Sequence, residues 1–136
     1  MKIVSWALCE SYSDAAARSY LAALILQDAG DPATSGHLYG IAAECAVKST
    51  LQGAGITIDR QSGLKVHFPQ LTQAIALHGF TRHMLPLLSL LQGPPELLSD
   101  YTIHSRYAAD RNIDVPLCTA WAADAEKIFL SLGFSI

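Results

Sequence analysis

The sequence predicts an all-α protein, an up-and-down bundle of four or five helices in one domain. Apolar residues recur at helical rather than alternating spacing along nearly every segment. Glycines, prolines and capping residues interrupt these segments at intervals of about one helix length. The 136 residues suffice for a substantial core, and a hydrophobic content of 51% predicts a thick helical core together with a surface that a second subunit covers.

The first long helix is expected over residues 13–29. Ser13 and Asp14 are suited to a helix start, and Ala, Tyr, Leu and Ile side chains then recur on one face. Gly30 and Pro32 are expected to end the run.

The second helix is expected over residues 34–52, because the segment SGHLYGIAAECAVKSTL is apolar with few interruptions. It is expected to end at Gly53 and Gly55. The polar connection of residues 52–66 is longer than most links in a bundle, which favours a mobile or functional loop.

Three shorter helical segments are expected in the second half. One begins at Pro69 and stops at Gly79. The next covers residues 84–93, where Pro86 is expected to bend it. Residues 96–108 are expected to form another helix.

The last helix is expected to begin at Asp114 as its cap, with Pro116 in its first turn, after an irregular connection over residues 109–114. The bundle domain is accordingly assigned to residues 13–136, with residues 1–12 as an N-terminal extension. These ten or so leading residues reach Glu10 too early for a signal peptide, and no apolar run approaches the length of a membrane span. We therefore expect a cytoplasmic protein.

Three polar residues form one stripe on the second helix. His37, Glu44 and Lys48 fall within about 40° of one another on a helical wheel, with apolar flanks on both sides. Glu44 and Lys48 have the favourable i, i+4 order, so the pair could simply stabilise the helix. Alternatively Glu44 pairs with Arg106, or the stripe lines a cleft that reads a phosphate or a base.

Further candidates lie outside this helix. His67, just ahead of the third helix, is either a helix-start hydrogen bonder or a lining residue of the cleft. Tyr107 could stack on a base or simply pack. His104, Arg106 and Arg111 form the densest local group able to bind an anion, and the same group could be a solvated turn.

Charge and cysteine content restrict the function classes. A net charge of −3 argues against a protein that grips nucleic acid through its overall field, although local basic spots remain compatible with it. Cys9, Cys45 and Cys118 are widely separated in apolar contexts, which indicates reduced thiols rather than disulfides or a zinc site. No metal, cofactor, DNA or membrane is expected as a partner.

The segments AARSYLAALIL, SGHLYGIAAECAVKSTLQ, KVHFPQLTQAI and SRYAADRN follow one another in this order ahead of the final helix. Their order and spacing resemble those of the HEPN domain family over about residues 13–132. The positions of this chain that match the family pattern are Glu44, Lys48, His67, Arg106 and Tyr107.

The resemblance implies a helical bundle, often a homodimer, frequently encoded beside or fused to a minimal nucleotidyltransferase. Many members act in toxin–antitoxin systems, RNA metabolism or nucleotide binding. The ribonuclease branch carries on a late helix an Arg and a His that are separated by four to six intervening residues. Here the pair with that spacing, Arg60 and His67, precedes the third helix, and no His follows Arg106 or Arg111. The chain thus departs from the ribonuclease branch.

The sequence favours a binding and regulatory module that associates with a nucleotide, RNA or a partner nucleotidyltransferase. This module is expected to form a homodimer. One alternative is a metal-independent ribonuclease that uses Arg60 or Arg106 with His67 or His104. The other is a purely structural dimerisation module.

Overall fold

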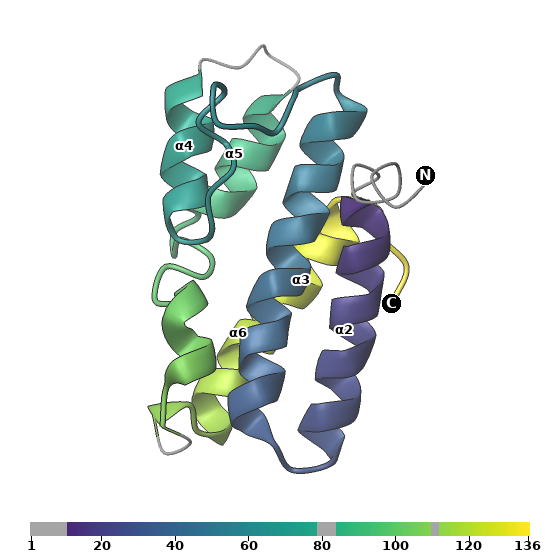
Figure 1. Ribbon diagram of the computed structural model, residues 1–136, viewed down its shortest axis with the longest axis vertical. Helices are drawn as coiled ribbons and strands as arrows, with labels where there is room; N and C mark the ends of the chain where they lie inside the picture. Colours follow the sequence, from purple (N-terminus) through teal and green to yellow (C-terminus); the bar gives the residue numbers. More distant parts are fainter. Residues whose placement is uncertain (1–10, 79–83, 110–111) are drawn as a thin grey trace, which may run out of the picture.

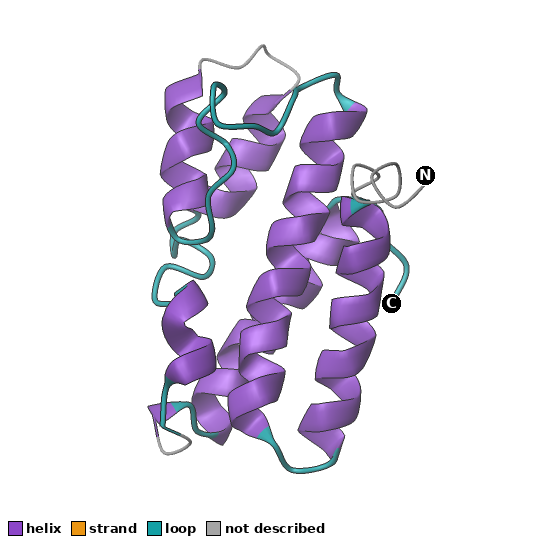
Figure 2. Cartoon of the chain, viewed as in Figure 1, coloured by secondary structure: helices purple, strands orange, loops and turns teal. Residues whose placement is uncertain are grey.

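The described residues form a bundle of helices without a strand. The computed structural model describes residues 11–78, 84–109 and 112–136. Within these ranges the chain forms five α-helices and one 3-10 helix (Figure 1, Figure 2). They are α2 (Tyr12–Asp28), α3 (Pro32–Gly53), α4 (Gln70–His78), α5 (Leu85–Gln92), η2 (Ile103–Tyr107) and α6 (Val115–Ser131). The predicted all-α fold class is confirmed.

Capping side chains fix where the two long N-terminal helices begin. The Ser11 hydroxyl accepts a hydrogen bond from the backbone N–H of Asp14 at 3.2 Å, which starts α2 one residue ahead of the predicted range. Asp31 caps α3 through the N–H of Thr34 at 3.2 Å. Pro32 is therefore the first residue of α3 rather than a terminator of α2, because a first-turn residue needs no N–H.

The predicted helix over residues 96–108 is wrong. Only η2 is helical in this stretch, and the residues ahead of it form turns. Leu98 has a positive φ of 56°, and its N–H donates to the Asp124 carboxylate on α6 at 3.0 Å instead of to a helical carbonyl. Pro94 and Pro95, just ahead of this stretch, offer no N–H, and the N–H of Leu97 donates to the Leu91 carbonyl of α5.

The other elements match the sequence reading closely. α4 begins one residue after Pro69, and α5 lies inside the predicted 84–93 segment. Pro86 stands in the first turn of α5, where a missing N–H breaks no helical hydrogen bond, so the bend expected at this residue has no cause. Asp114 caps α6 by accepting from the N–H of Leu117 at 3.0 Å. Local signals sufficed here because each helix start is encoded by a cap or a proline.

Helix α3 forms the centre of the molecule. It packs against α2 and α6 and carries η2 on a further side, with α6 passing behind it in Figure 1. Gly36 lets the Trp121 ring approach, and Gly40 does the same for Tyr101, whose ring would lie 2.0 Å from an added Cβ. Among the helices described, none combines the length and apolar character that crossing a bilayer requires.

Candidate functional site

The loop between α3 and α4 forms the roof of a pocket over the polar stripe of α3. A turn fixes the loop, since Ser62 N–H donates to the Asp59 carboxylate at 2.8 Å and Ser62 Oγ donates to the Asp59 carbonyl at 2.9 Å. Leu64 and Phe68 anchor the loop because both are fully buried. The loop therefore holds a defined path over α3.

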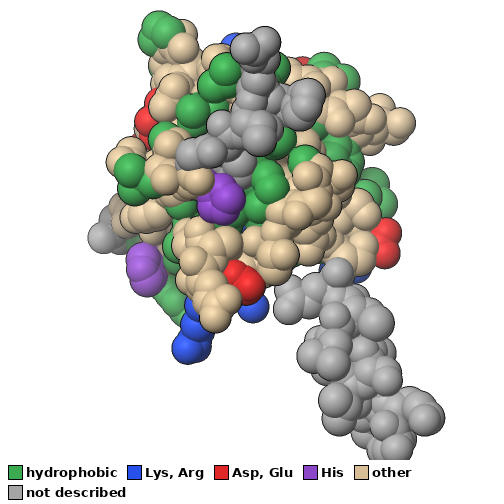
Figure 3. Space-filling view, turned by 90° about the horizontal axis from the view of Figure 1, so that it is seen from above, with side chains coloured by type: hydrophobic (Ala, Val, Ile, Leu, Met, Phe, Trp, Pro, Cys, Tyr) green, Lys and Arg blue, Asp and Glu red, His purple; other side chains and the backbone are tan. Residues whose placement is uncertain are grey.

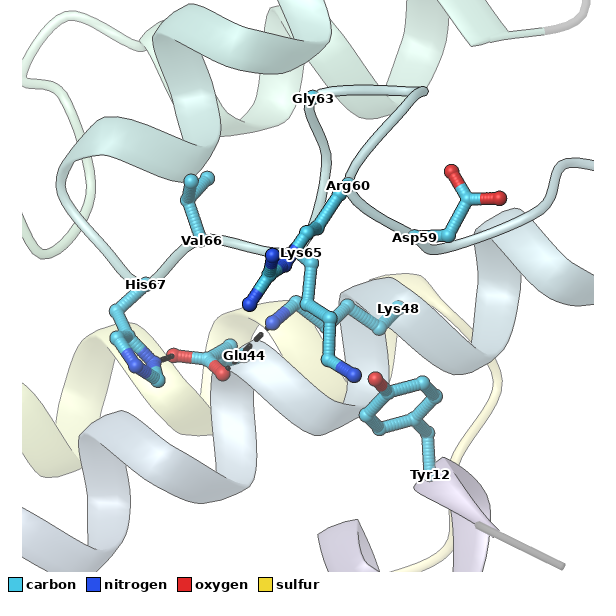
Figure 4. A pocket seen from close by; sticks show the side chains of 9 residues that line it. All are labelled: Tyr12, Glu44, Lys48, Asp59, Arg60, Gly63, Lys65, Val66 and His67. Carbon is cyan, nitrogen blue, oxygen red and sulfur yellow. Dashed lines mark hydrogen bonds and ion pairs between the residues drawn. The ribbon is translucent and has the colours of Figure 1, made fainter. Parts of the chain in front are cut away.

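The pocket beneath this loop has a volume of roughly 660 Å³ (Figure 4). Its walls come from the first turn of α2, two successive turns of α3 and the loop. The lining residues are Tyr12, Glu44, Lys48, Asp59, Arg60, Gly63, Lys65, Val66 and His67.

The base of the pocket is a buried carboxylate with two partners. Lys48 Nζ donates to Glu44 Oε2 at 2.9 Å, and His67 Nδ1 lies 2.8 Å from Glu44 Oε1 (Figure 4). The Glu44 and Lys48 side chains are only 6% and 4% exposed, whereas that of His67 is 47% exposed. Because a carboxylate only accepts, the His67 proton at Nδ1 faces Glu44.

The sequence places His67 so that backbone and side chain have separate roles. Its carbonyl accepts from the N–H of Leu71 at 2.9 Å and so starts α4. Its side chain turns back to Glu44. The structure thus places the His67 side chain in the pocket lining and its backbone at the start of α4.

Basic side chains converge on this pocket. Figure 4 shows Arg60 pointing from the loop toward the amine of Lys48 and Lys65 reaching toward Tyr12, while the Asp59 carboxylate points away. Lys48 Nζ also lies 5.7 Å from the centroid of the Tyr12 ring, within cation–π range. Viewed from this end of the bundle, Lys and Arg side chains gather at one edge beside an acidic side chain (Figure 3). The pocket is locally positive in a chain of net charge −3.

Two of the remaining predicted residues, His37 and Arg106, line a second, smaller hollow between α3 and η2. His37 Nδ1 lies 3.0 Å from Ser105 Oγ and 3.3 Å from Tyr101 Oη. Burial lowers the pKa of His37, the Arg106 guanidinium lowers it further, and Glu44 opposes the shift. The ring is therefore held neutral near neutral pH.

The expected ion pair between Glu44 and Arg106 does not form. Both oxygens of Glu44 have other partners, and Arg106 is exposed with its guanidinium carbon 4.8 Å from the Tyr107 ring centroid. The predicted site is consequently divided into two parts. Glu44, Lys48 and His67 share the larger pocket, whereas His37 and Arg106 line the smaller one.

His104 and Tyr107 are exposed on η2, outside the lining of either hollow, and Arg111 lies outside the described residues. The sequence reading had missed Tyr12 and Lys65. Lys65 carried a signal, since it follows Arg60 in a long polar loop ahead of His67. Tyr12 carried none, because only the packing of α2 on α3 brings it near Lys48.

No cluster of three or more His, Cys, Asp or Glu side chains in the described ranges could hold a metal ion. Cys45 and Cys118 are buried free thiols, while Cys9 falls in the part of the chain that is not described. Burial raises the pKa of the Cys45 thiol to about 11, so it is protonated and unreactive at neutral pH.

Comparison with known proteins finds no matching family model, and searches of curated proteins and of solved structures return no significant match.

Proposed function

We propose that this protein is a binding module for a phosphorylated ligand, a nucleotide or an RNA end, held in the pocket under the α3–α4 loop. The observation that carries the proposal is that three basic residues, Lys48, Arg60 and Lys65, line one pocket together with the buried Glu44 (Figure 4). A lysine ammonium has three N–H donors, and one of those of Lys48 donates to Glu44. The others, together with the Arg60 guanidinium, suit phosphate oxygens.

Burial of the charged pair supports a role beyond stability. Removing two charges from water has a desolvation free-energy cost that can exceed the gain from their mutual attraction. A buried ion pair of this kind is therefore weak evidence that the pair stabilises the fold. Glu44 instead fixes the positions of Lys48 and His67 at the base of the pocket. Such fixed polar groups bind a charged ligand with little reorganisation.

The tyrosine at the rim supports a ligand with an aromatic base. Tyr12 contributes its ring to the pocket wall, where a base could stack beside the bound phosphate. The resemblance to HEPN domains is in line with nucleotide or RNA binding and with a nucleotidyltransferase as protein partner.

Isothermal titration with adenosine 5′-monophosphate, a 5′-phosphorylated RNA and unphosphorylated adenosine tests this function. The two phosphorylated ligands are expected to bind and adenosine to bind far more weakly. Arg60→Gln is expected to weaken binding about tenfold, the loss of one charge-assisted contact. Lys127→Gln is the matched control, because Lys127 lies on α6 beside a different hollow. Absence of heat with both phosphorylated ligands would refute the proposal.

The module acts as a homodimer in this proposal, through an apolar stripe on α2. Leu21, Leu24 and Ile25 are 59%, 44% and 59% exposed, and their i, i+3, i+4 spacing places them on one face. Multi-angle light scattering at micromolar concentration is expected to give twice the chain mass, and Leu24→Glu to give a monomer. A monomeric wild type would remove this part of the proposal.

A second candidate, a metal-independent ribonuclease, is favoured by the Glu44–His67 hydrogen bond beside Arg60. A carboxylate that orients an imidazole is the arrangement of a general base, and a guanidinium can offset charge on a phosphate. Incubation of RNA with the protein and a chelator tests it. Cleavage that His67→Ala abolishes would establish the activity, and intact RNA would exclude it.

A further inference from the structure

Two hollows lie along the same side of α3. The larger is the pocket over Glu44 and Lys48, and the smaller, roughly 110 Å³, lies near the start of the helix. Figure 1 shows the loop that covers the first and the 3-10 segment that borders the second on the same side of α3, one beyond the other along its axis.

The polar stripe of α3, formed by His37, Glu44 and Lys48, has residues in both hollows. His37 belongs to the smaller hollow and Lys48 to the larger, and eleven residues of helix place them about 16 Å apart along the axis. His37 lies within electrostatic reach of Glu44 and His67 in one direction and of Arg106 in the other. Glu44 is the only acidic residue between His37 and Lys48, and Lys48 and His67 pair with it.

The smaller hollow has the chemistry of an anion site. Its lining includes Arg106, the half-buried His37 and Ser105, which is 7% exposed. Ser105 Oγ can donate to an anion in place of its contact with His37. Tyr107 next to Arg106 is 74% exposed, with the Arg106 guanidinium 4.8 Å from the centroid of its ring, so a large aromatic side chain stands near the smaller hollow.

We propose that the two hollows are the two ends of one binding site for a single-stranded oligonucleotide. Its terminal phosphate lies at Lys48 and Arg60, and a phosphate further along the strand lies at Arg106. A single nucleotide cannot bridge about 16 Å of helix, whereas a short strand carries phosphates at regular intervals and bases that stack on exposed aromatic rings. This inference rests on the proposed function, because it uses the same larger pocket.

The experiment compares 5′-phosphorylated oligouridylates of increasing length by isothermal titration. Affinity is expected to rise from the mononucleotide through the dinucleotide to the tetranucleotide, and then to change little for the octanucleotide. Arg106→Gln is expected to lower tetranucleotide affinity about tenfold while mononucleotide affinity stays within about twofold. Arg60→Gln is expected to weaken the binding of both the mononucleotide and the tetranucleotide. The control Lys127→Gln is expected to change neither affinity. Arg106 is exposed, so its replacement leaves the core intact.

The two proposals fail in different ways. If the mononucleotide binds and the tetranucleotide binds no better, or if Arg106→Gln leaves the tetranucleotide unaffected, the elongated site is refuted while the phosphate pocket stands. If no ligand of any length binds, both proposals are refuted.

Discussion

At the scale of single residues, Glu44 and Lys48 are the most consequential pair in the chain. Lys48→Met leaves the carboxylate buried with His67 as its remaining partner, and removal of one member of a buried ion pair costs about 3–5 kcal/mol. We expect the free energy of unfolding, measured by urea denaturation, to fall by about 3 kcal/mol. The matched control is Lys127→Met on the exposed surface of α6, for which less than about 0.5 kcal/mol is expected.

A second variant separates charge from packing. Glu44→Gln combined with Lys48→Met removes both charges and nearly preserves side-chain volume, so we expect the double variant to regain much of the lost stability. A double variant less stable than Lys48→Met would show instead that the Glu44 carboxylate stabilises the fold through its contact with His67.

His37 makes stability depend on pH. Since burial lowers its pKa in the folded protein, the unfolded chain takes up this proton first, at about pH 6.5. The contribution of the neutral, buried His37 ring to the free energy of unfolding is fully present above that pH, and it is lost as the pH falls below it. We expect the free energy of unfolding, measured by urea titration, to fall less between pH 7.5 and pH 5.5 for His37→Asn than for the wild type. His104→Asn, at an exposed ring, is expected to match the wild type, and parallel profiles for all three would contradict the assignment.

At the scale of elements, the sequence predicted what caps and prolines encode and failed where tertiary partners decide. Asp114 marks the start of α6 by a contact three residues away, so its signal is local. The backbone N–H of Leu98 instead donates to the carboxylate of Asp124, twenty-six residues further on. Periodicity cannot register such a partner, and it therefore predicted a helix over residues 96–108.

The contact of η2 with α3 depends on a glycine. A Cβ at Gly40 would lie 2.0 Å from the Tyr101 ring, so Gly40→Ala must displace the ring and the segment that leads into η2. We expect a loss of about 1–3 kcal/mol in thermal or urea unfolding, although alanine is the better helix former. Gly53→Ala, with no atom within 4 Å of the added Cβ, is the control and is expected to be neutral or slightly stabilising. Equal effects at the two positions would argue against close packing at Gly40.

At the scale of the whole molecule, the candidate site shows how far a linear pattern reaches. The stripe of His37, Glu44 and Lys48 could be predicted because one helix carries it. The partner of Glu44 could not, because the path of the loop decides whether His67 or Arg106 meets the carboxylate, and buried anchors such as Leu64 set that path.

Charge distribution over the molecule gives the last prediction. The chain carries a net charge of −3, so its overall field opposes an anionic ligand that the basic pocket attracts. Asp59→Asn removes one negative charge beside the pocket and keeps an oxygen for the N–H of Ser62. We expect it to raise affinity for adenosine 5′-monophosphate about threefold at low salt, by isothermal titration, because one poorly screened charge contributes on that order.

The same variant distinguishes a local field from a global one. In 1 M salt the screening length falls to about 3 Å, so the gain from Asp59→Asn is expected to vanish. Asp28→Asn changes the net charge equally at the end of α2, remote from the pocket lining, and is expected to leave affinity unchanged. An equal gain from both variants would mean that total charge governs binding, and that the cations around Lys48 do not define the site.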